Sequence, residues 1–422
     1  MSAEPDVIVV GGGIGGLSAA FALTRKGLKV RVLERSEAFG EVGAGIQLAP
    51  NCTRILNYYG LLGEAKQLGV LPVTMVMKDA LDGTVLTSLD LLDMEQRYGT
   101  PYIVIHRSDL HGLFLKACQN AGVDLRTSQH VTEYQNTPAG AGVRLADGTC
   151  HEARLVVAAD GLHSVARRQF VGDEPVNSAY VAYRGAVPMD KVREHNISES
   201  DVVVYVGPGC HFVQYPLRGG DMFNQVAVFE SPKAKAGEED WGTPDELDAA
   251  FAYATQNVRQ GLPLMGRDRW WRMFDRDPIM TWVYGRIALL GDAAHPPLQY
   301  IAQGAIMAIE DGYVLAEHLA GNSGDRARAD IARADIDAAL AAYQAVRPEH
   351  GRRVITTSRA WGNLWHLNGE KRQRRNEILR ARDPRDYSFV DWLYRITALT
   401  PAEEPPMFQA TPLDTASPAP VT

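Results

Sequence analysis

A glycine pattern near the N-terminus limits the folds open to this chain more than any other feature. Gly11, Gly13 and Gly16 form the spacing G-x-G-x-x-G directly after the apolar run 7–10, which is typical of a buried parallel strand. The first glycine permits a tight turn, the second lets the backbone approach a pyrophosphate, and the third allows close packing of helix on strand. The pattern predicts a strand, a turn and a helix whose N-terminus binds an anion.

The residues after these glycines complete a βαβ unit. The sequence predicts a helix over 17–26 and a second strand over 29–34. Glu34 ends that strand, where its carboxylate can accept hydrogen bonds from ribose hydroxyls and would repel a 2′-phosphate. A glycine-rich turn alone is weak evidence, but strand, helix and acid together predict a dinucleotide site. The motif by itself does not distinguish FAD from NAD.

The rest of the chain predicts a nucleotide domain that is divided in the sequence by an inserted sheet. Two further runs, 154–159 and 286–290, resemble buried strands, whereas 178–230 alternates, is rich in Tyr, Val and Phe, and contains glycine turns. We therefore expect an α/β fold with a Rossmann-like domain, an inserted and mainly antiparallel β-sheet substrate domain, and a helical C-terminal region. The predicted parts are 1–177 with 276–350 for the nucleotide domain, 178–275 for the β-rich domain, 351–400 for the helical region and 401–422 for a flexible, proline-rich tail.

Composition argues against several classes of protein. A chain of 422 residues is longer than one hydrophobic core supports, and its net charge of −8 argues against a general nucleic-acid binder. There is no run of 18 apolar residues for a transmembrane helix, and residues 1–6 do not resemble a secretory signal. The four cysteines are widely scattered, without metal or redox spacing. We expect a cytoplasmic protein with no metal site.

Three motifs, far apart in the chain, together carry a family resemblance. They are the glycine fingerprint with Glu34-Arg35, Asp160-Gly161 within AADGLHSVAR, and Gly291-Asp292 within LLGDAAHPPLQYIAQGAIMAIEDG. In this order the chain resembles the group A flavoprotein aromatic hydroxylases over roughly residues 6 to 395. The resemblance implies a bound FAD. Because no second G-x-G-x-x-G is present, it also implies that NADH visits the protein transiently.

The resemblance also assigns residues to FAD. Asp292 would bind the ribityl chain, Arg107 in HRSDLH would reach the pyrophosphate, the Gly304-Ala305 backbone would lie against the isoalloxazine ring, and Asp160 would take part in flavin and nicotinamide handling. Simpler roles remain open, because Asp292 can cap a helix, Arg107 can be a solvated surface residue and Asp160 can form a turn. The predicted cofactor residues are Gly11, Gly13, Gly16, Glu34, Arg35, Arg107, Asp160, Asp292, Gly304 and Ala305.

The stretch 210–215 predicts one wall of a substrate pocket. Side chains alternate across a strand, so His211, Val213 and Tyr215 share one face, while residues 210, 212 and 214 share the other. An imidazole and a phenol flanking an apolar side chain suit a phenolic acid. Taken alone, His211 is more often a structural histidine.

Four stretches narrow the resemblance to the branch of the family that hydroxylates 3-hydroxybenzoate at carbon 6: CHFVQYPLRGG, NQVAVFESP, DRWW and HPPLQY. By this resemblance His211 and Gln299 assist hydroxylation and Tyr215 contacts the substrate. The implied reaction uses NADH and O₂ and yields 2,5-dihydroxybenzoate (gentisate). Alternatives are a decarboxylating hydroxylase of the salicylate or hydroxynicotinate type, and a non-hydroxylating FAD protein that acts as a redox sensor or docking module.

Two questions stay open at the level of the sequence. No motif singles out an arginine for the substrate carboxylate, although Arg184 is a candidate. The C-terminal aromatic residues can pack inside the chain or form a homodimer interface; they are Trp361, Trp365, Phe389 and Trp392.

Overall fold

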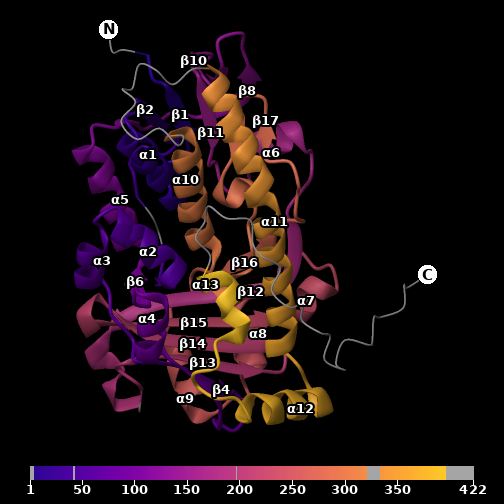
Figure 1. Cartoon of the computed structure of the whole chain (residues 1–422). Coiled ribbons are helices and arrows are strands. Elements are labelled where there is room, and N and C mark those ends of the chain that lie inside the picture. The colour runs from indigo at the N-terminus through magenta and orange to yellow at the C-terminus, as the bar shows by residue number, and fades with distance from the viewer. Residues whose placement is uncertain (1–3, 41–42, 196, 321–332, 396–422) are drawn as a thin grey trace.

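Two large sheets at opposite ends of the molecule form the framework of the fold (Figure 1). The computed structural model describes residues 4–40, 43–195, 197–320 and 333–395. The predicted tail, 401–422, lies outside these residues. The long helix α11 (Arg333–Trp365) runs past both sheets, as Figure 1 shows in orange. Within the described residues, no helix combines the length and the apolar character needed to cross a membrane.

The six-stranded sheet forms the nucleotide-binding end. Its order is β17-β18-β11-β1-β2-β7, and all neighbours are parallel except β17 and β18. The side chains of β1, β2 and β11 are buried throughout, which explains the continuous apolar runs of β1 and β11; in β2 the buried Arg31 pairs with Asp124 at 2.7 Å. The predicted strands at 154–159 and 286–290 are thus confirmed as β11 and β18. The strands are β1 (Val7–Val10), β2 (Val30–Leu33), β7 (Asp124–Arg126), β11 (Leu155–Ala158), β17 (Val283–Tyr284) and β18 (Ile287–Leu289).

Three glycines let the first strand, the glycine turn and two helices pack closely. Gly11 has a φ of +106°, and a Cβ on Gly16 would lie 1.9 Å from the Gly11 carbonyl oxygen. Helix α1 (Ile14–Arg25) begins directly after the turn, three residues earlier than predicted, and packs against α10 (Gly304–Ala320). A Cβ on Gly312 would lie 2.7 Å from the Cα of Ala19, so the two helix backbones approach closely.

The seven-stranded sheet forms the other end, in the order β16-β12-β15-β14-β13-β4-β5. Its neighbours are antiparallel except β13 and β4, so the antiparallel sheet predicted over 178–230 is confirmed. Strands β4 and β5 join it from the N-terminal part of the chain, while the predicted domain boundaries stay a prediction. The strands are β4 (Thr74–Asp79), β5 (Val85–Asp90), β12 (Val176–Pro188), β13 (Asp201–Gly207), β14 (Cys210–Leu217), β15 (Met222–Glu230) and β16 (Trp271–Asp275).

Smaller sheets and helices surround these two layers. Strands β3 and β6 pair between the large sheets, and β8, β9 and β10 form a three-stranded sheet at the nucleotide end (Figure 1). These strands are β3 (Gly45–Leu48), β6 (Ile103–His106), β8 (Val131–Asn136), β9 (Ala141–Leu145) and β10 (Cys150–Ala153). The remaining helices are α2 (Pro50–Tyr58), α3 (Leu62–Leu68), α4 (Leu91–Tyr98), α5 (Arg107–Asn120), α6 (Val165–Phe170), α7 (Pro232–Lys235), α8 (Pro244–Ala250), α9 (Gln256–Gly261), α12 (Gly369–Arg380) and α13 (Ser388–Tyr394).

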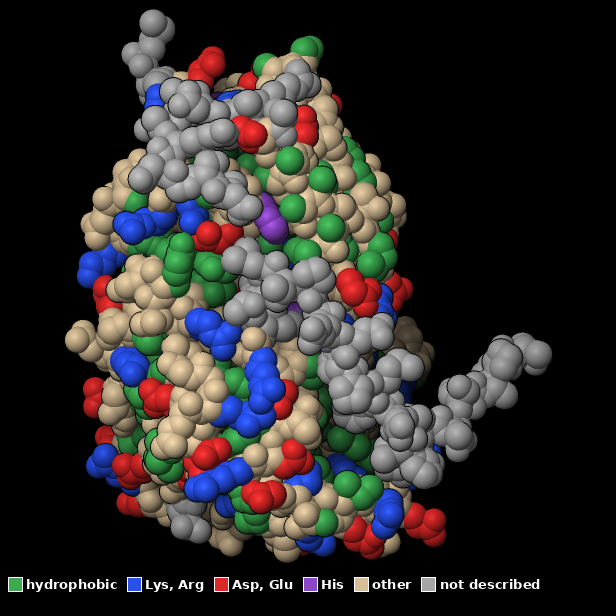
Figure 2. All heavy atoms as spheres, in the orientation of Figure 1, with side chains coloured by type: hydrophobic (Ala, Val, Ile, Leu, Met, Phe, Trp, Pro, Cys, Tyr) green, Lys and Arg blue, Asp and Glu red, His purple; other side chains and the backbone are tan. Residues whose placement is uncertain are grey.

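Ion pairs attach the C-terminal helices to β4 of the seven-stranded sheet and to α4. The buried carboxylate of Asp79, at the end of β4, accepts hydrogen bonds from Arg372 at 2.7 and 2.9 Å and from Asn376 at 2.6 Å, both on α12. Arg97 on α4 pairs with Asp391 on α13 at 2.8 Å. Figure 2 shows acidic and basic side chains intermingled over this half of the visible face. The predicted helical C-terminal region is confirmed.

A buried charge cluster joins α10 and α11. Arg347 on α11 donates to Asp311 at 2.7 Å and to Glu310 at 3.1 Å, and all three side chains are buried. Asp311 also accepts from the backbone N–H of Gly291 at 3.0 Å and contacts His295 at 2.5 Å. Burial opposes ionisation of Asp311, but attraction to His295 and Arg347 outweighs it and lowers the pKa of Asp311 to about 2. The cluster therefore holds the turn at Gly291 against α10.

We predict that Arg347→Met destabilises the protein by about 3–5 kcal/mol, because it leaves two carboxylates buried without their cation. Arg352→Met on the same helix is the matched control. Arg352 is exposed and pairs with Glu349 one turn away, so its loss should change the free energy of unfolding by no more than about 0.5 kcal/mol. Denaturant unfolding of both variants measures the difference. Equal effects would contradict the central role of Arg347.

Candidate functional site

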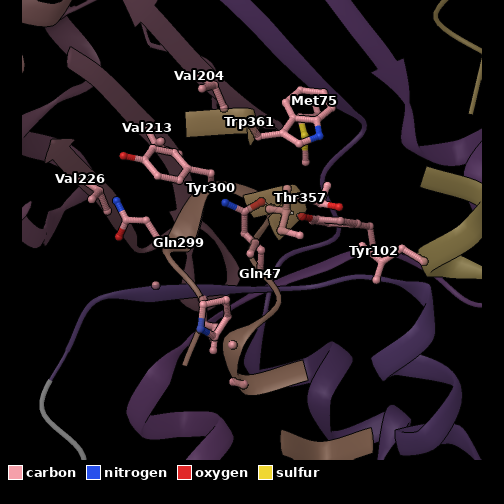
Figure 3. Close-up of a pocket in the computed structure, with 18 of the residues that line it drawn as sticks. Gln47, Met75, Tyr102, Val204, Val213, Val226, Gln299, Tyr300, Thr357 and Trp361 are labelled. Carbon is pink, nitrogen blue, oxygen red and sulfur yellow. Dashed lines mark hydrogen bonds between the residues drawn. The ribbon is translucent and has the colours of Figure 1, made fainter. Parts of the chain in front are cut away.

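One cavity of about 530 Å³ extends from the glycine turn to the inner face of the seven-stranded sheet. Parts of the chain that are far apart in the sequence line it, among them the glycine turn, β3, the residues that flank β6, the inner face of the sheet, the turn at 290–292, the start of α10, and the C-terminal helices. Figure 3 shows Met75, Val204, Val213, Val226 and Trp361 among the apolar side chains at the sheet end. A single cavity therefore has room for a nucleotide cofactor at one end and a small apolar ligand at the other.

The nucleotide end has the shape and polarity that a dinucleotide pyrophosphate requires. Gly13, Gly15 and Gly16 line the cavity, and no side chain caps the N-terminus of α1. The first N–H groups of this helix are thus open to an anion. Side chains at Gly11 and Gly16 would collide with backbone, since a Cβ on Gly11 would lie 2.2 Å from the carbonyl oxygen of Ala159. These residues fit the pyrophosphate of FAD.

Six of the ten predicted cofactor residues line the cavity: Gly13, Gly16, Arg107, Asp292, Gly304 and Ala305. Asp292 is exposed in the turn that follows β18, and Gly304 begins α10. Gly304 has open space, because an added Cβ would meet nothing nearer than Pro297 at 3.9 Å. A flat ring such as isoalloxazine can therefore approach the backbone at Gly304.

The other four predicted cofactor residues lie outside the lining: Gly11, Glu34, Arg35 and Asp160. Glu34 accepts hydrogen bonds from the backbone N–H groups of Gly12 at 2.7 Å and Ser36 at 2.8 Å, which holds its carboxylate beside the glycine turn. Arg35 is exposed. Asp160 accepts from the Tyr134 hydroxyl at 2.9 Å and from Val165 N–H at 2.8 Å, at the start of α6. Its contacts are those of a turn and a helix cap, and its cofactor role stays a prediction.

The substrate wall has the alternation that the sequence predicts. His211, Val213 and Tyr215 on β14 face the cavity. Cys210 and Phe212, on the opposite face, belong to a second core between the sheet and helices α8 and α9. One strand thus separates a ligand cavity from a packed core, because its side chains point alternately to the two faces.

His211 is buried and held by nitrogen atoms on both sides of its ring. Its Nδ1 lies 2.9 Å from Nε2 of His366, and its Nε2 lies 3.4 Å from the Gln299 amide nitrogen. Rings of Tyr300, Trp365 and His366 surround it, with centroids 5.1 to 5.4 Å away. Burial, and then the neighbouring His366, lower the pKa of His211 well below its usual range. The imidazole is therefore neutral at physiological pH and can accept a proton.

Tyr215 ends a chain of hydrogen bonds that the sequence analysis missed. The Tyr102 hydroxyl donates to Gln47 at 2.6 Å, and the Gln47 side chain in turn bonds Tyr215. Burial raises the pKa of Tyr215, so its phenol stays protonated and can donate a hydrogen bond. Gln47 on β3 and Tyr102 beside β6 belong to no motif. Only the pairing of these two strands brings them to the cavity, where Figure 3 shows them near Thr357.

Arg184 and Gln299 both line the cavity and form a hydrogen bond with each other. The Arg184 guanidinium on β12 donates from Nη2 to Gln299 Oε1 at 2.8 Å and lies 5.8 Å from the ring of Trp271. Gln299 comes from the short 3₁₀ turn η6 (Gln299–Ile301), just before α10. Arg184 is linked to His211 through Gln299, which contacts both residues. A contact of Arg184 with the substrate carboxylate stays a prediction.

Comparison with known proteins supports this arrangement. Residues 4–358 match the model of the FAD binding domain family. The chain is 38% identical to 3-hydroxybenzoate 6-hydroxylase of Polaromonas naphthalenivorans, over 93% of this chain and 96% of that one. It is 36% identical to 3-amino-4-hydroxybenzoate 2-monooxygenase PtnB3 of Streptomyces platensis, over 94% and 97% of the two chains. The crystal structure of Klebsiella pneumoniae HpxO with FAD and uric acid is similar too, with a TM-score of 0.77, 26% identity and coverage of 89% and 92%.

We predict that Asp292→Ala weakens retention of FAD by about 1.5–3 kcal/mol, because the variant would lose the charge-assisted hydrogen bonds that this carboxylate is predicted to make to the ribityl chain. The dissociation constant should rise roughly 10- to 150-fold. Titration of the apoprotein with FAD measures it. Asp245→Ala, an exposed aspartate of α8 outside the cavity, is the control and should bind FAD like the parent. A preference for FMN over FAD would contradict the assignment of the glycine turn.

Proposed function

The chain belongs to the FAD binding domain family and is a flavin-dependent aromatic monooxygenase, and on that basis we propose that it hydroxylates 3-hydroxybenzoate at carbon 6 with NADH and O₂. The product is 2,5-dihydroxybenzoate. The observation that carries the proposal is the buried imidazole of His211, which lines a cavity that continues to the glycine turn. The relative that bears the name 3-hydroxybenzoate 6-hydroxylase supports the choice of substrate.

The cofactor end of the cavity would hold FAD through residues that the chain provides. The glycine turn and the N-terminus of α1 would bind the pyrophosphate with Arg107, Asp292 would bind the ribityl chain, and the backbone at 304–305 would lie against the ring. Bound FAD, reduced by NADH, supplies with O₂ the electrophilic oxygen that is transferred. A cytoplasmic location, which the four free cysteines would suit, is part of the same proposal.

His211 would act as the proton acceptor for the substrate phenol. The phenol O–H bond breaks and an N–H bond forms at Nε2 of His211, the nitrogen that faces Gln299. The resulting phenolate makes the ring electron-rich at its ortho and para carbons. For 3-hydroxybenzoate the carbon para to the hydroxyl is carbon 6, which gives the proposed product.

Tyr215 and the apolar lining would position the ring. The Tyr215 phenol stays protonated and can donate a hydrogen bond to an oxygen of the substrate. Val204, Val213 and Val226 on the inner face of the sheet, with Met75, would contact the ring and exclude water. An orienting donor within an apolar wall is what a small aromatic acid requires.

Product analysis distinguishes this reaction from the alternatives. The purified enzyme would be supplied with NADH and, in turn, 3-hydroxybenzoate, salicylate, 6-hydroxynicotinate and 3-amino-4-hydroxybenzoate. Gentisate from the first acid, without release of CO₂, supports the proposal. Release of CO₂ from salicylate or 6-hydroxynicotinate would indicate a decarboxylating enzyme. Binding of FAD without product from any acid would favour a redox sensor or docking module. Parallel assays with NADPH test the choice of NADH.

We predict that His211→Ala impairs hydroxylation far more than flavin reduction. Loss of a positioned base typically slows its step by about 10²–10⁴-fold. NADH oxidation in the presence of 3-hydroxybenzoate should continue, while H₂O₂ replaces gentisate. Simultaneous measurement of NADH, H₂O₂ and gentisate reports this uncoupling.

Two further variants of the same site serve as comparisons for His211→Ala. Gln299→Ala should uncouple more mildly, because it removes a neighbour of the base. Tyr215→Phe should mainly raise KM, because it removes a donor rather than the base. Gentisate formation by His211→Ala at the parental rate and coupling would show that His211 is structural.

We predict that coupling stays constant as the pH falls through 6.5. Burial and His366 lower the pKa of His211, so its neutral form persists below the pH at which an exposed histidine gains its proton. The base is lost only when the pH falls through that lowered value. The ratio of gentisate formed to NADH consumed, measured from pH 5.5 to 8, checks this. A decline with a midpoint near 6.5 would show that the base is not the buried imidazole.

A further inference from the structure

Four polar side chains from separate elements form a continuous row beside the cavity. Arg184 on β12 contacts Gln299 of η6, Gln299 contacts His211 on β14, and His211 contacts His366 after the end of α11. The three distances are 2.8, 3.4 and 2.9 Å. At each contact, the donor or acceptor role of one residue determines the role that the next residue must take. The direction of every hydrogen bond in the row can therefore be worked out from one end.

The direction is set at the Arg184 end. A guanidinium carries only donors, so it requires the carbonyl oxygen of the Gln299 amide. That choice turns the NH₂ group of Gln299 toward Nε2 of His211. Because an NH₂ group only donates, Nε2 of His211 must carry a lone pair. Arg184 thus determines the polarity of an imidazole with which it makes no direct hydrogen bond.

The position of the remaining proton on His211 follows from its neutrality. A neutral imidazole carries one N–H, so with a lone pair on Nε2 the proton is on Nδ1. That N–H donates to Nε2 of His366 at 2.9 Å. His366 must then accept, which places its own proton on Nδ1. The reverse arrangement would set an N–H of His211 against the NH₂ group of Gln299.

The surroundings of His366 keep its ring neutral, so that it can act as the acceptor in this row. Its ring stacks on Tyr180 with centroids 4.7 Å apart, and Tyr300 and His211 pack on it as well. Burial, and then the charge of Arg375, lower the pKa of His366 to about 3. His366 is therefore neutral at physiological pH, and its Nε2 can accept the hydrogen bond from Nδ1 of His211.

We propose that Arg184 and His366 are positioning residues that lock His211 in the tautomer with its proton on Nδ1 and its lone pair on Nε2, facing the cavity. The inference rests on the proposed function, in which His211 accepts the phenol proton. The 3.4 Å contact between Gln299 and Nε2 is long for a hydrogen bond, so a substrate hydroxyl can replace it without loss of a strong interaction. The base is thereby kept in its acceptor form before substrate arrives.

The tautomer can be measured directly by ¹⁵N NMR of the FAD-loaded enzyme labelled at its histidines. Protonated and unprotonated ring nitrogens resonate far apart, and loss of signals in His211→Ala identifies those of His211 among the 11 histidines. We expect a protonated Nδ1 and an unprotonated Nε2 in the parent enzyme. Gln299→Glu should reverse this, because a carboxylate only accepts and so requires a proton on Nε2.

A second variant tests the other end of the row. His366→Phe keeps a ring against Tyr180 but removes the acceptor, so both His211 nitrogens should become partly protonated. The ratio of gentisate to H₂O₂ should fall by about 10- to 100-fold. Activity typically falls by this factor when a metal-binding histidine loses the hydrogen-bond partner that orients it, and we expect a similar loss for His211. His130→Phe, at an exposed histidine, is the matched control and should alter neither readout.

Two results would overturn the inference: a protonated Nε2 in the parent enzyme, or the parental tautomer in both Gln299→Glu and His366→Phe. The NMR measurement needs no turnover, so it stands even if 3-hydroxybenzoate is not the substrate. Absence of gentisate with the predicted tautomer would refute the proposed reaction and leave the locked imidazole intact.

Discussion

The buried charge cluster of Glu310, Asp311 and Arg347 is the interaction on which the geometry of the site depends. It lies where α10, α11 and the turn at Gly291 meet, and Glu310 extends it to α2 through Asn51 at 2.7 Å. Two carboxylates and a guanidinium are costly to bury and are stable only while each satisfies the others. Because Asp311 holds the backbone of Gly291, the cluster sets the position of Asp292 relative to the start of α10.

The seven-stranded sheet separates two environments, and this separation produces the chemistry of the site. Its outer face packs into a second core with α8 and α9, whereas its inner face meets the cavity. Burial acts in opposite directions on the pKa values of the two titratable side chains that β14 presents to the cavity. It lowers the pKa of His211 and raises the pKa of Tyr215. Both groups are therefore neutral at physiological pH, one as a proton acceptor and the other as a hydrogen-bond donor.

Hydrogen-bond direction adds a second level of control that burial does not provide. Burial makes His211 neutral but leaves its proton free to occupy either nitrogen. The row from Arg184 through Gln299 to His366 distinguishes the two, because a guanidinium cannot accept a hydrogen bond. The same logic places Gln47 between Tyr102 and Tyr215 on the other side of the cavity. Amide side chains are suited to this task, since they offer an acceptor at one atom and donors at the other.

The sequence alone determined the elements that depend on local pattern. The glycine spacing with its flanking strand and helix, the buried strands at 154–159 and 286–290, and the alternating faces of 210–215 are short-range features, and the structure has all of them. Motifs in their family order also indicated a flavin hydroxylase, and the comparisons bear that out. The predicted start of the first helix was wrong by three residues, because α1 begins at the glycine turn itself rather than at Leu17.

Only the tertiary structure decided which distant residues meet. Gln47 and Tyr102 belong to no motif and reach the cavity through strand pairing, and His366 reaches His211 through helix docking. Strands β4 and β5 join a sheet whose other strands come much later in the chain. The carboxylate of Asp160 accepts hydrogen bonds at the start of α6, a contact that the sequence does not specify, and its role toward the cofactor stays a prediction. The tautomer of His211 is the clearest case, because it depends on contacts among residues 184, 211, 299 and 366. Local periodicity carries no information about such contacts, since they arise when separate elements pack and their polar groups must satisfy one another.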